Sequence, residues 1–170
     1  MTYRYDNNGA LASVTDSATG TVTTYYYDFT DRLVKYTESD GTDTHSVSYG
    51  YDTNNNLSTQ TETINGSTHT ISYAYDDDNR ITAVTSGDTA KTFTYDAYGR
   101  VSGQTLASDG ESVYTTSYSY HAPNNYNTTA QIYTLTVDSA VYDVTYTYTY
   151  DGNGWRHTLG VRWRCAALMW

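Results

Sequence analysis

Carboxylates beside Asn and Gly are the residues whose types and spacing could bind a metal. They occur at Asp76-Asp77-Asp78-Asn79 and Asp151-Gly152-Asn153-Gly154, and oxygen-rich loops of this kind suit calcium. An EF-hand loop also needs a bidentate acid at its twelfth position, where this sequence has Gly87 and Arg162. The pattern therefore predicts no EF-hand, and it favours solvated turns over an irregular calcium site at residues 76–78.

Nucleophiles and histidines give no catalytic arrangement either. The four histidines lie far apart and lack the spacing of metal ligands: His45, His69, His121 and His157. No sequence pattern pairs Cys165 with a histidine or places it in a Ser/His/Asp type of arrangement. The sequence also contains no Gly-rich phosphate-binding loop. His69 shares a predicted strand face with Ile71 and Tyr73, which predicts a packed, hydrogen-bonded side chain. We therefore expect no enzyme activity, no cofactor and no metal.

Composition excludes several classes of protein. The chain has 170 residues, 21 of them Tyr, and a net charge of −10. Tyr and Thr favour strands while good helix formers are scarce, which excludes an all-helical fold. An acidic chain without a basic patch is a poor nucleic-acid binder. No stretch is long and apolar enough to span a membrane, and the first residues lack the hydrophobic region of a signal peptide.

A Tyr-x-Tyr-Asp motif recurs through most of the chain, and self-similarity of this kind indicates a repeat architecture. Successive copies start 20 to 30 residues apart. The seven copies comprise Tyr3, Tyr5 and Asp6; Tyr25, Tyr27 and Asp28; Tyr49, Tyr51 and Asp52; Tyr73, Tyr75 and Asp76; Phe93, Tyr95 and Asp96; Tyr118 and Tyr120, followed by His121; and Tyr148, Tyr150 and Asp151.

The residue three positions after each Asp predicts a turn. Gly, Asn and Asp tolerate a positive φ best, and only these types occur there: Gly9, Asp31, Asn55, Asn79, Gly99, Asn124 and Gly154. The Asp side chain can accept backbone N–H groups of the residues that follow it. We expect a type I turn closed by a left-handed residue, which reverses the chain.

A second turn signal lies midway through most units, as at Asp40-Gly41 and Asn65-Gly66. Two turns per unit leave two strands, and the strand before each motif alternates between faces. His69, Ile71, Tyr73 and Tyr75 fall on one face of such a strand. The predicted fold class is all-β: an antiparallel meander of repeated β-hairpins that forms a curved, spiralling sheet.

The pattern Tyr-x-Tyr-Asp-x-x-Gly-Arg-Leu resembles the tyrosine-aspartate (YD) repeat of RHS proteins. The nearest copy is Tyr95-Asp96-Ala97-Tyr98-Gly99-Arg100-Val101, and the likeness covers residues 1–154. This family includes bacterial wall-associated and contact-dependent toxins, insecticidal toxin-complex shell proteins and teneurins. The resemblance implies a non-catalytic part of a β-shell that encapsulates or presents a C-terminal toxin. It also implies a secreted or cell-surface location within a larger parent chain, with further YD repeats and the toxin as partners.

The sequence departs from the family in its length and at its end. Seven repeats are too few to close a shell, and the Asp-Pro-rich motif that ends the bacterial core is absent, so neither a toxin nor autocleavage residues are assigned. Residues 155–170 contain three Arg and no acid. We expect residues 1–154 to form the YD-repeat sheet and residues 155–170 to be an atypical tail without strand period, from a frame shift or truncation.

The tyrosine rows allow a second function. Cross-strand aromatic packing explains the motif tyrosines, but Tyr26, Tyr36, Tyr98 and Tyr114 lie outside the motif positions. If they are exposed, they could stack on sugars in a cell-surface carbohydrate-binding or adhesion module, with glycans as partners. A sheet cut out of a larger wall also has open edges, which predicts self-association of the isolated chain.

Overall fold

The computed structural model describes residues 1–122, 130–151 and 153–165, and within these it contains fourteen β-strands and no helix. The predicted all-β antiparallel meander is confirmed, since consecutive strands pair in chain order. The chain divides into two compact units, Met1–Gly87 and Asp88–Trp170. In the described part of the chain, no helix is long and apolar enough to cross a membrane.

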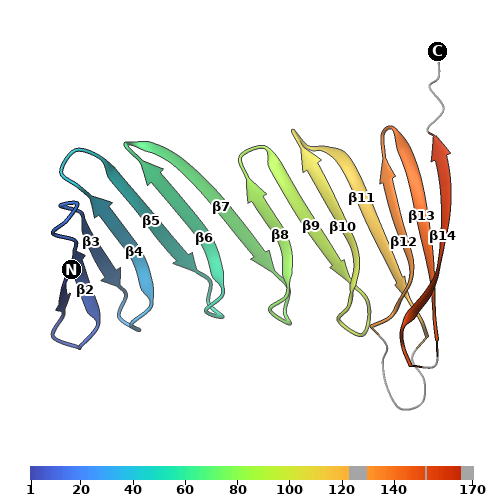
Figure 1. The fold of residues 1–170 in the computed structure, drawn as a ribbon, viewed down its shortest axis with the longest axis horizontal. Helices are drawn as coiled ribbons and strands as arrows, with labels where there is room; N and C mark the ends of the chain where they lie inside the picture. The colour runs from blue at the N-terminus through green and yellow to red at the C-terminus, as the bar shows by residue number, and fades with distance from the viewer. Residues whose placement is uncertain (123–129, 152, 166–170) are drawn as a thin grey trace. The chain divides into compact units, whose positions relative to one another are not determined.

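Each unit is a run of antiparallel strands (Figure 1). The first unit contains β1 (Thr2–Tyr5), β2 (Leu11–Thr15), β3 (Val22–Tyr27), β4 (Leu33–Ser39), β5 (Thr44–Tyr51), β6 (Leu57–Ile64), β7 (Ser67–Tyr75) and β8 (Ile81–Ser86). The second contains β9 (Thr89–Tyr95), β10 (Val101–Ser108), β11 (Glu111–Tyr120), β12 (Ile132–Ser139), β13 (Tyr142–Tyr150) and β14 (Arg156–Cys165).

The predicted left-handed residues are found wherever the motif is described. Positive φ angles occur at Gly9, Asp31, Asn55, Asn79, Gly99 and Gly154, whereas Asn124 lies outside the described residues. The register shifts by one residue at the second motif tyrosine, for example between Tyr26 and Tyr27. A three-residue turn that ends in a left-handed residue produces such a bulge.

The longer connection after Tyr120 closes like the other motif turns. The His121 amide donates to the Gln131 carbonyl at 3.0 Å, as the Asp28 amide donates to the Arg32 carbonyl at 2.9 Å. This connection is longer than the other motif turns, but the same kind of backbone hydrogen bond closes it. The predicted loop at Pro123 itself lies outside the described residues.

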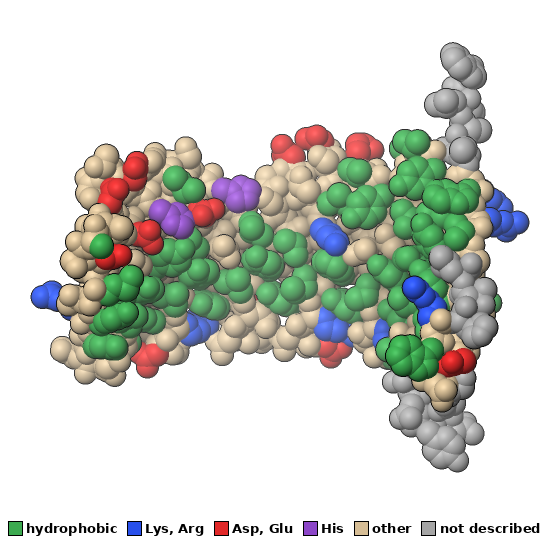
Figure 2. Space-filling view, viewed as in Figure 1, with side chains coloured by type: hydrophobic (Ala, Val, Ile, Leu, Met, Phe, Trp, Pro, Cys, Tyr) green, Lys and Arg blue, Asp and Glu red, His purple; other side chains and the backbone are tan. Residues whose placement is uncertain are grey.

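The two faces of each sheet have different side chains. The motif tyrosines share one face with aliphatic residues, and we call it the tyrosine face; Tyr25 opposes Tyr36, and Tyr36 opposes Val47. The opposite face carries Ser and Thr, whose hydroxyls pair across strands, as at Thr61–Thr70 (3.0 Å) and Thr136–Thr145 (3.1 Å). Figure 2 shows hydrophobic side chains gathered over the middle of the strands in each unit.

Nothing covers the tyrosine face in the described structure. Val47 and Val144 are the two hydrophobic side chains that are buried, with 4% and 3% exposure. A single layer of strands leaves one side of each residue open, so half-burial is its normal state. Hydrophobic burial alone therefore stabilises this sheet weakly, and other contacts must hold neighbouring hairpins together.

The prediction that the strand pattern stops at Gly154 is wrong. Residues Arg156–Cys165 form β14, which pairs with β13 from Tyr150↔Arg156 to Tyr142↔Cys165. The Asp151 turn is complete, with its amide donating to the Trp155 carbonyl at 3.0 Å, and it directs the chain back along β13. Main-chain pairing needs no Tyr or acidic residue, so a change of composition does not end a strand. The boundary at Gly154 stays a prediction.

Turn substitutions test the backbone argument. The left-handed conformation costs a non-glycine residue about 1 kcal/mol, and a Cβ at Gly9 would meet nothing within 4 Å. We expect Gly9→Ala to lower the free energy of unfolding by about 1 kcal/mol and Asp31→Gly to raise it by a similar amount. Urea unfolding measures both. Equal midpoints for Gly9→Ala and the parent chain would contradict the turn assignment.

Candidate functional site

The motif turns form the most regular polar arrangement in the chain. In each described turn, one Asp carboxylate oxygen accepts the amides of the second and fourth residues after it. At Asp76 these donors are the amides of Asp78 (3.0 Å) and Arg80 (2.9 Å). The same pair of bonds occurs at Asp6, Asp28, Asp52, Asp96 and Asp151.

In four of these turns, the second carboxylate oxygen binds the side chain four residues later. Arg32, Arg80 and Arg100 each donate Nε to the Asp of their own turn at 2.7 Å, and Asn56 donates to Asp52 at 3.0 Å. The sequence shows these Arg residues but did not predict their role. A recurring basic residue four positions after a turn Asp is the signal that could have revealed it.

These contacts lower the pKa of four of the turn carboxyls, those of Asp28, Asp52, Asp76 and Asp96. At Asp76, hydrogen bonds from the Arg80 guanidinium and then from the Arg80 amide hold the pKa below its usual value. At Asp28 and Asp96, removal from water raises the pKa, but the hydrogen bonds to the ionised carboxylate outweigh it and the net direction is down. The turns therefore favour the ionised form of Asp.

The second motif tyrosine joins its hairpin to the preceding one. The Tyr51 hydroxyl donates to the Leu33 carbonyl at 2.7 Å. The same bond, at 2.7 to 3.0 Å, joins Tyr27 to Leu11, Tyr75 to Leu57 and Tyr120 to Val101. We call this contact the tyrosine lock.

The lock forms where main-chain pairing between hairpins ends. The β4–β5 ladder stops at Lys35↔Ser48, and the lock acceptor Leu33 lies two residues before Lys35. The β2–β3, β6–β7 and β10–β11 ladders also stop two residues after their lock acceptor. The hydroxyl thus satisfies a carbonyl that the diverging strand no longer reaches.

The basic side chain of one turn also contacts the next hairpin. The Arg32 guanidinium lies over the Tyr51 ring, 4.5 Å from its centroid, and donates to Asn55 Oδ1 at 2.5 Å. The Arg100 guanidinium lies 4.2 Å from the Tyr120 ring centroid. One Arg therefore binds its own Asp and the tyrosine of the next lock, by a cation–π contact.

The first motif tyrosines pack on the tyrosine face with varied partners. Tyr25 and Tyr36 have ring centroids 6.4 Å apart, whereas Tyr49 opposes Gln60 and Tyr73 opposes Val84. The expected cross-strand aromatic pair is therefore present at Tyr25 and Tyr36, whereas Tyr49 and Tyr73 oppose non-aromatic side chains.

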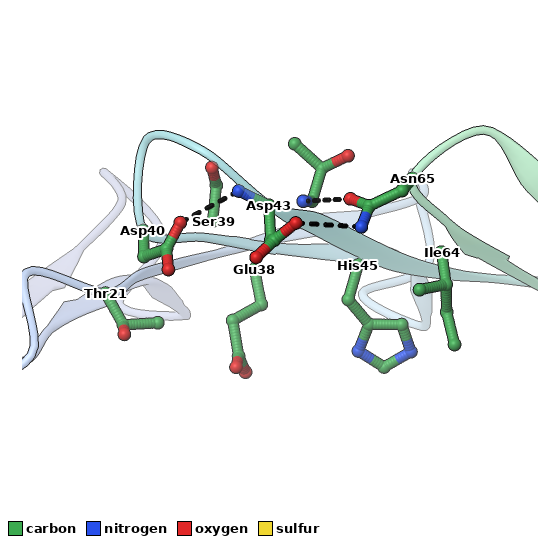
Figure 3. Close-up of a pocket in the computed structure, with 9 residues that line it drawn as sticks. Thr21, Glu38, Ser39, Asp40, Asp43, His45, Ile64 and Asn65 are labelled. Carbon is green, nitrogen blue, oxygen red and sulfur yellow. Dashed lines mark hydrogen bonds between the residues drawn. The ribbon is translucent and has the colours of Figure 1, made fainter.

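An acidic pocket lies at the opposite strand ends of the first unit (Figure 3). Its volume is about 360 Å³, and Glu38, Asp40, Asp43 and His45 are among its lining residues. Asp40 accepts the amides of Thr42 and Asp43, each at 2.9 Å. Asp43 accepts from the Asn65 side chain at 2.8 Å. Two of the carboxylates are thus occupied in shaping the loop, and nothing there resembles a nucleophile with a base.

Two carboxylates of the acidic turn at residues 76–78 contact Arg80. Arg80 occupies the Asp76 carboxylate and lies 3.2 Å from Asp78 Oδ2. No group of three or more possible metal ligands exists among the described residues. The solvated-turn interpretation stays a prediction.

The described histidines serve separate contacts. His45 Nε2 lies 2.8 Å from Glu62 Oε1, and the His121 ring packs edge-on against Tyr133 and Tyr150. His69 bonds Ser86 at 2.9 Å, but its predicted packing is wrong because the residue is exposed. It lies near the end of the β6–β7 hairpin, where the face has few neighbours. The side chains of His157 and Cys165 lie outside the described residues.

The four tyrosines outside the motif differ in exposure, and the two in the first unit lie on opposite faces. Tyr26 and Tyr98 are exposed, at 46% and 56%, whereas Tyr36 and Tyr114 are half-buried. Tyr26 opposes Lys35 and therefore points away from the face that holds Tyr36. This separation offers no continuous aromatic surface for a sugar.

The sequence matches one family in a comparison with protein-family profiles. The RHS Repeat family matches residues 5–43, 51–91 and 75–112, which covers more than half of the chain. A comparison with curated proteins finds no match.

Solved structures resemble the chain at low sequence identity. The crystal structure of TcdB2-TccC3-Cdc42 is 12% identical over 97% of this chain and 11% of that chain, with a TM-score of 0.36. TcdB2-TccC3 without its hypervariable C-terminal region is 13% identical over 94% and 11%, with a TM-score of 0.38. A porin-like protein from Bacteroides uniformis is 16% identical over 96% and 89%, with a TM-score of 0.36. The chain spans about a ninth of the first two.

Removal of one hydroxyl tests the tyrosine lock. Tyr51→Phe keeps the ring under Arg32 but leaves the Leu33 carbonyl unpaired, so we expect the free energy of unfolding to fall by about 1 kcal/mol. Tyr26→Phe is the matched control, because its hydroxyl makes no hydrogen bond in the described structure, and it should change little. Urea unfolding compares them. Equal effects of the two substitutions would contradict the lock.

Acid should weaken the turns. Because the folded-state pKa values of Asp28, Asp52, Asp76 and Asp96 are lowered, their stabilisation is present above the unfolded pKa. It is lost as pH falls through the folded pKa, so the urea midpoint should drop between about pH 5 and pH 2.

Asp76→Asn should lower the midpoint at pH 7 and flatten its drop in acid, since the charged contact with Arg80 is gone. Asp77→Asn is the control, because the Asp77 side chain has no hydrogen bond in the described structure. A pH profile for Asp76→Asn that runs parallel to the parent profile would show that the turn carboxylate is not the titrating group.

Proposed function

The chain belongs to the RHS repeat family, and on this premise we propose that it is a segment of a β-shell wall that encloses or presents a C-terminal toxin. The wall role is non-catalytic. The parent chain is larger, carries further repeats and is secreted or exposed at the cell surface. The structural repeat motif, from Tyr3 to Gly154, supplies the contacts that join one hairpin to the next.

The tyrosine lock is the observation that supports this proposal. In four copies a hairpin offers an acceptor carbonyl, such as that of Leu33, to a hydroxyl of the next hairpin, such as that of Tyr51. Donor and acceptor lie at equivalent positions in these four copies, so the same contact can join further hairpins. A wall is extended in this way without a second layer of structure.

The chemistry of the motif also supports a passive role. The groups that could act on a substrate are engaged with one another: the Asp76 carboxylate with amides and Arg80, and the Tyr75 hydroxyl with the Leu57 carbonyl. A carboxylate held ionised by hydrogen bonds is a poor general acid. The motif therefore supplies cohesion between hairpins.

The size of the native product tests whether this chain is part of a larger parent protein. An antibody raised against residues 1–150 is used to detect the product in the source cells and their medium. We expect a species far larger than the 19.0 kDa of this chain. Limited proteolysis of that species should spare a segment C-terminal to the repeats until the wall is unfolded. A native species of 19 kDa, or a C-terminal segment cleaved at once, would contradict the proposal.

Open edges predict that the isolated chain self-associates. The strand β14 pairs on one side only, with β13, and its Val161 and Trp163 are 44% and 65% exposed. An edge strand of this kind can pair with another copy. Light scattering should show a mass that rises with concentration, and Trp163→Lys should reduce the rise. A monodisperse monomer at all concentrations would contradict this prediction.

A further inference from the structure

Two carboxylates of the second unit lie directly opposite each other. Asp138 on β12 faces Asp143 on β13 in the antiparallel ladder. The Ser139 hydroxyl closes the turn between these strands, since it accepts the Tyr142 amide at 3.2 Å and donates to the Tyr142 carbonyl at 2.8 Å. Directly opposed side chains have Cβ atoms about 5 Å apart, and like charges in this position repel. The turn therefore keeps the two acids within reach of each other.

A basic side chain lies on the other side of Asp143. Arg164 on β14 is opposite Asp143, and Thr115 on β11 is opposite Asp138. The row across β11 to β14 therefore reads Thr, Asp, Asp and Arg, on strands that lie side by side (Figure 1). Asp143 thus has a carboxyl neighbour on one strand and a guanidinium neighbour on the next.

The other charged side chains described on β11 to β14 are Glu111, Arg156 and Arg162. Glu111 and Arg156 are the first residues of their strands, and neither is opposite an acid. Arg162 shares the face of Arg164 but is opposite Thr145. The tyrosines next to the row belong to the tyrosine face, because neighbouring residues of a strand alternate between faces. Asp143 and Arg164 are therefore the charged groups that directly adjoin Asp138 in this row.

The pKa of Asp138 agrees with a proton shared between the two acids. The hydrogen bond with the Asp143 carboxyl raises this pKa above its ordinary value, and the Asp143 charge and removal from water raise it further. A pair of this kind titrates as a unit. It is attractive while one proton is bound and repulsive after that proton leaves.

We propose that Asp143 is a pH-dependent switch between two neighbouring strands. In acid, one proton shared by Asp138 and Asp143 joins β12 to β13. When that proton leaves, Asp143 pairs with the Arg164 guanidinium and joins β13 to β14. The switch goes beyond the wall role, because it uses no residue of the tyrosine lock or of the motif turns.

The switch responds to acid in the direction opposite to the motif turns. The folded-state pKa of Asp138 is raised, so the stabilisation from the shared proton is complete below about pH 4, the ordinary pKa of Asp. It is lost as the pH rises through the raised pKa. The turn carboxylates, such as that of Asp96, have lowered pKa values and lose their stabilisation as the pH falls. Acid therefore weakens the turns and strengthens the contact between β12 and β13.

Carbon-13 NMR of the Asp carboxyl groups in the 170-residue chain tests the proposal. Asp138 should titrate above the ordinary Asp range in the parent chain and return toward it in Asp143→Asn, which cannot supply a carboxylate. Arg164→Gln removes the partner of the ionised form, so it should raise the Asp138 midpoint by about half a pH unit. Arg162→Gln is the matched control, because it removes the same charge from the same face, and its effect should be smaller.

Nitrogen-15 NMR of the arginine side chains tests the neutral form separately. The Arg164 Nε–H signal of the parent chain should shift as Asp138 loses its proton, and this shift should be absent in Asp143→Asn. Equal effects of Arg164→Gln and Arg162→Gln on the Asp138 midpoint would overturn the switch, since they would show only a general influence of charge. An Asp138 midpoint that Asp143→Asn leaves unchanged, or an Arg164 signal that ignores the titration, would overturn it as well.

Discussion

The bond between a tyrosine hydroxyl and the carbonyl of the preceding hairpin is the contact on which the rest of this structure depends. A single-layered sheet buries few side chains, and Val47 and Val144 are the two buried hydrophobic ones among the described residues. Hairpins must therefore be joined mainly along their shared edges. The main-chain ladder between hairpins ends two residues after the acceptor carbonyl, and the hydroxyl bonds that carbonyl.

The remaining motif residues follow from this bond. The left-handed residue and the Asp side chain turn the chain tightly just after the lock tyrosine, and the Arg four residues later binds that Asp and reaches the next lock ring. Where Asn56 replaces Arg, its side chain still bonds Asp52 and also Asn79 of the next turn. Different side chains thus preserve the same connection, which explains why the motif tolerates variation at this position.

The polar groups of the motif hold neighbouring hairpins together. Its carboxylates, guanidinium groups and hydroxyls bind one another or the main chain, which is the arrangement expected of a structural repeat.

Local chemistry is what the sequence by itself determined. The Asp turns, their left-handed residues and the alternating strands depend on contacts within about four residues, and the printed sequence shows them directly. Tertiary structure decided the rest, because the lock joins residues 16 to 19 positions apart and its acceptor is a carbonyl that every residue type possesses. The pairing of β14 and the exposure of His69 likewise depend on which strands lie next to each other, a relation that composition does not encode.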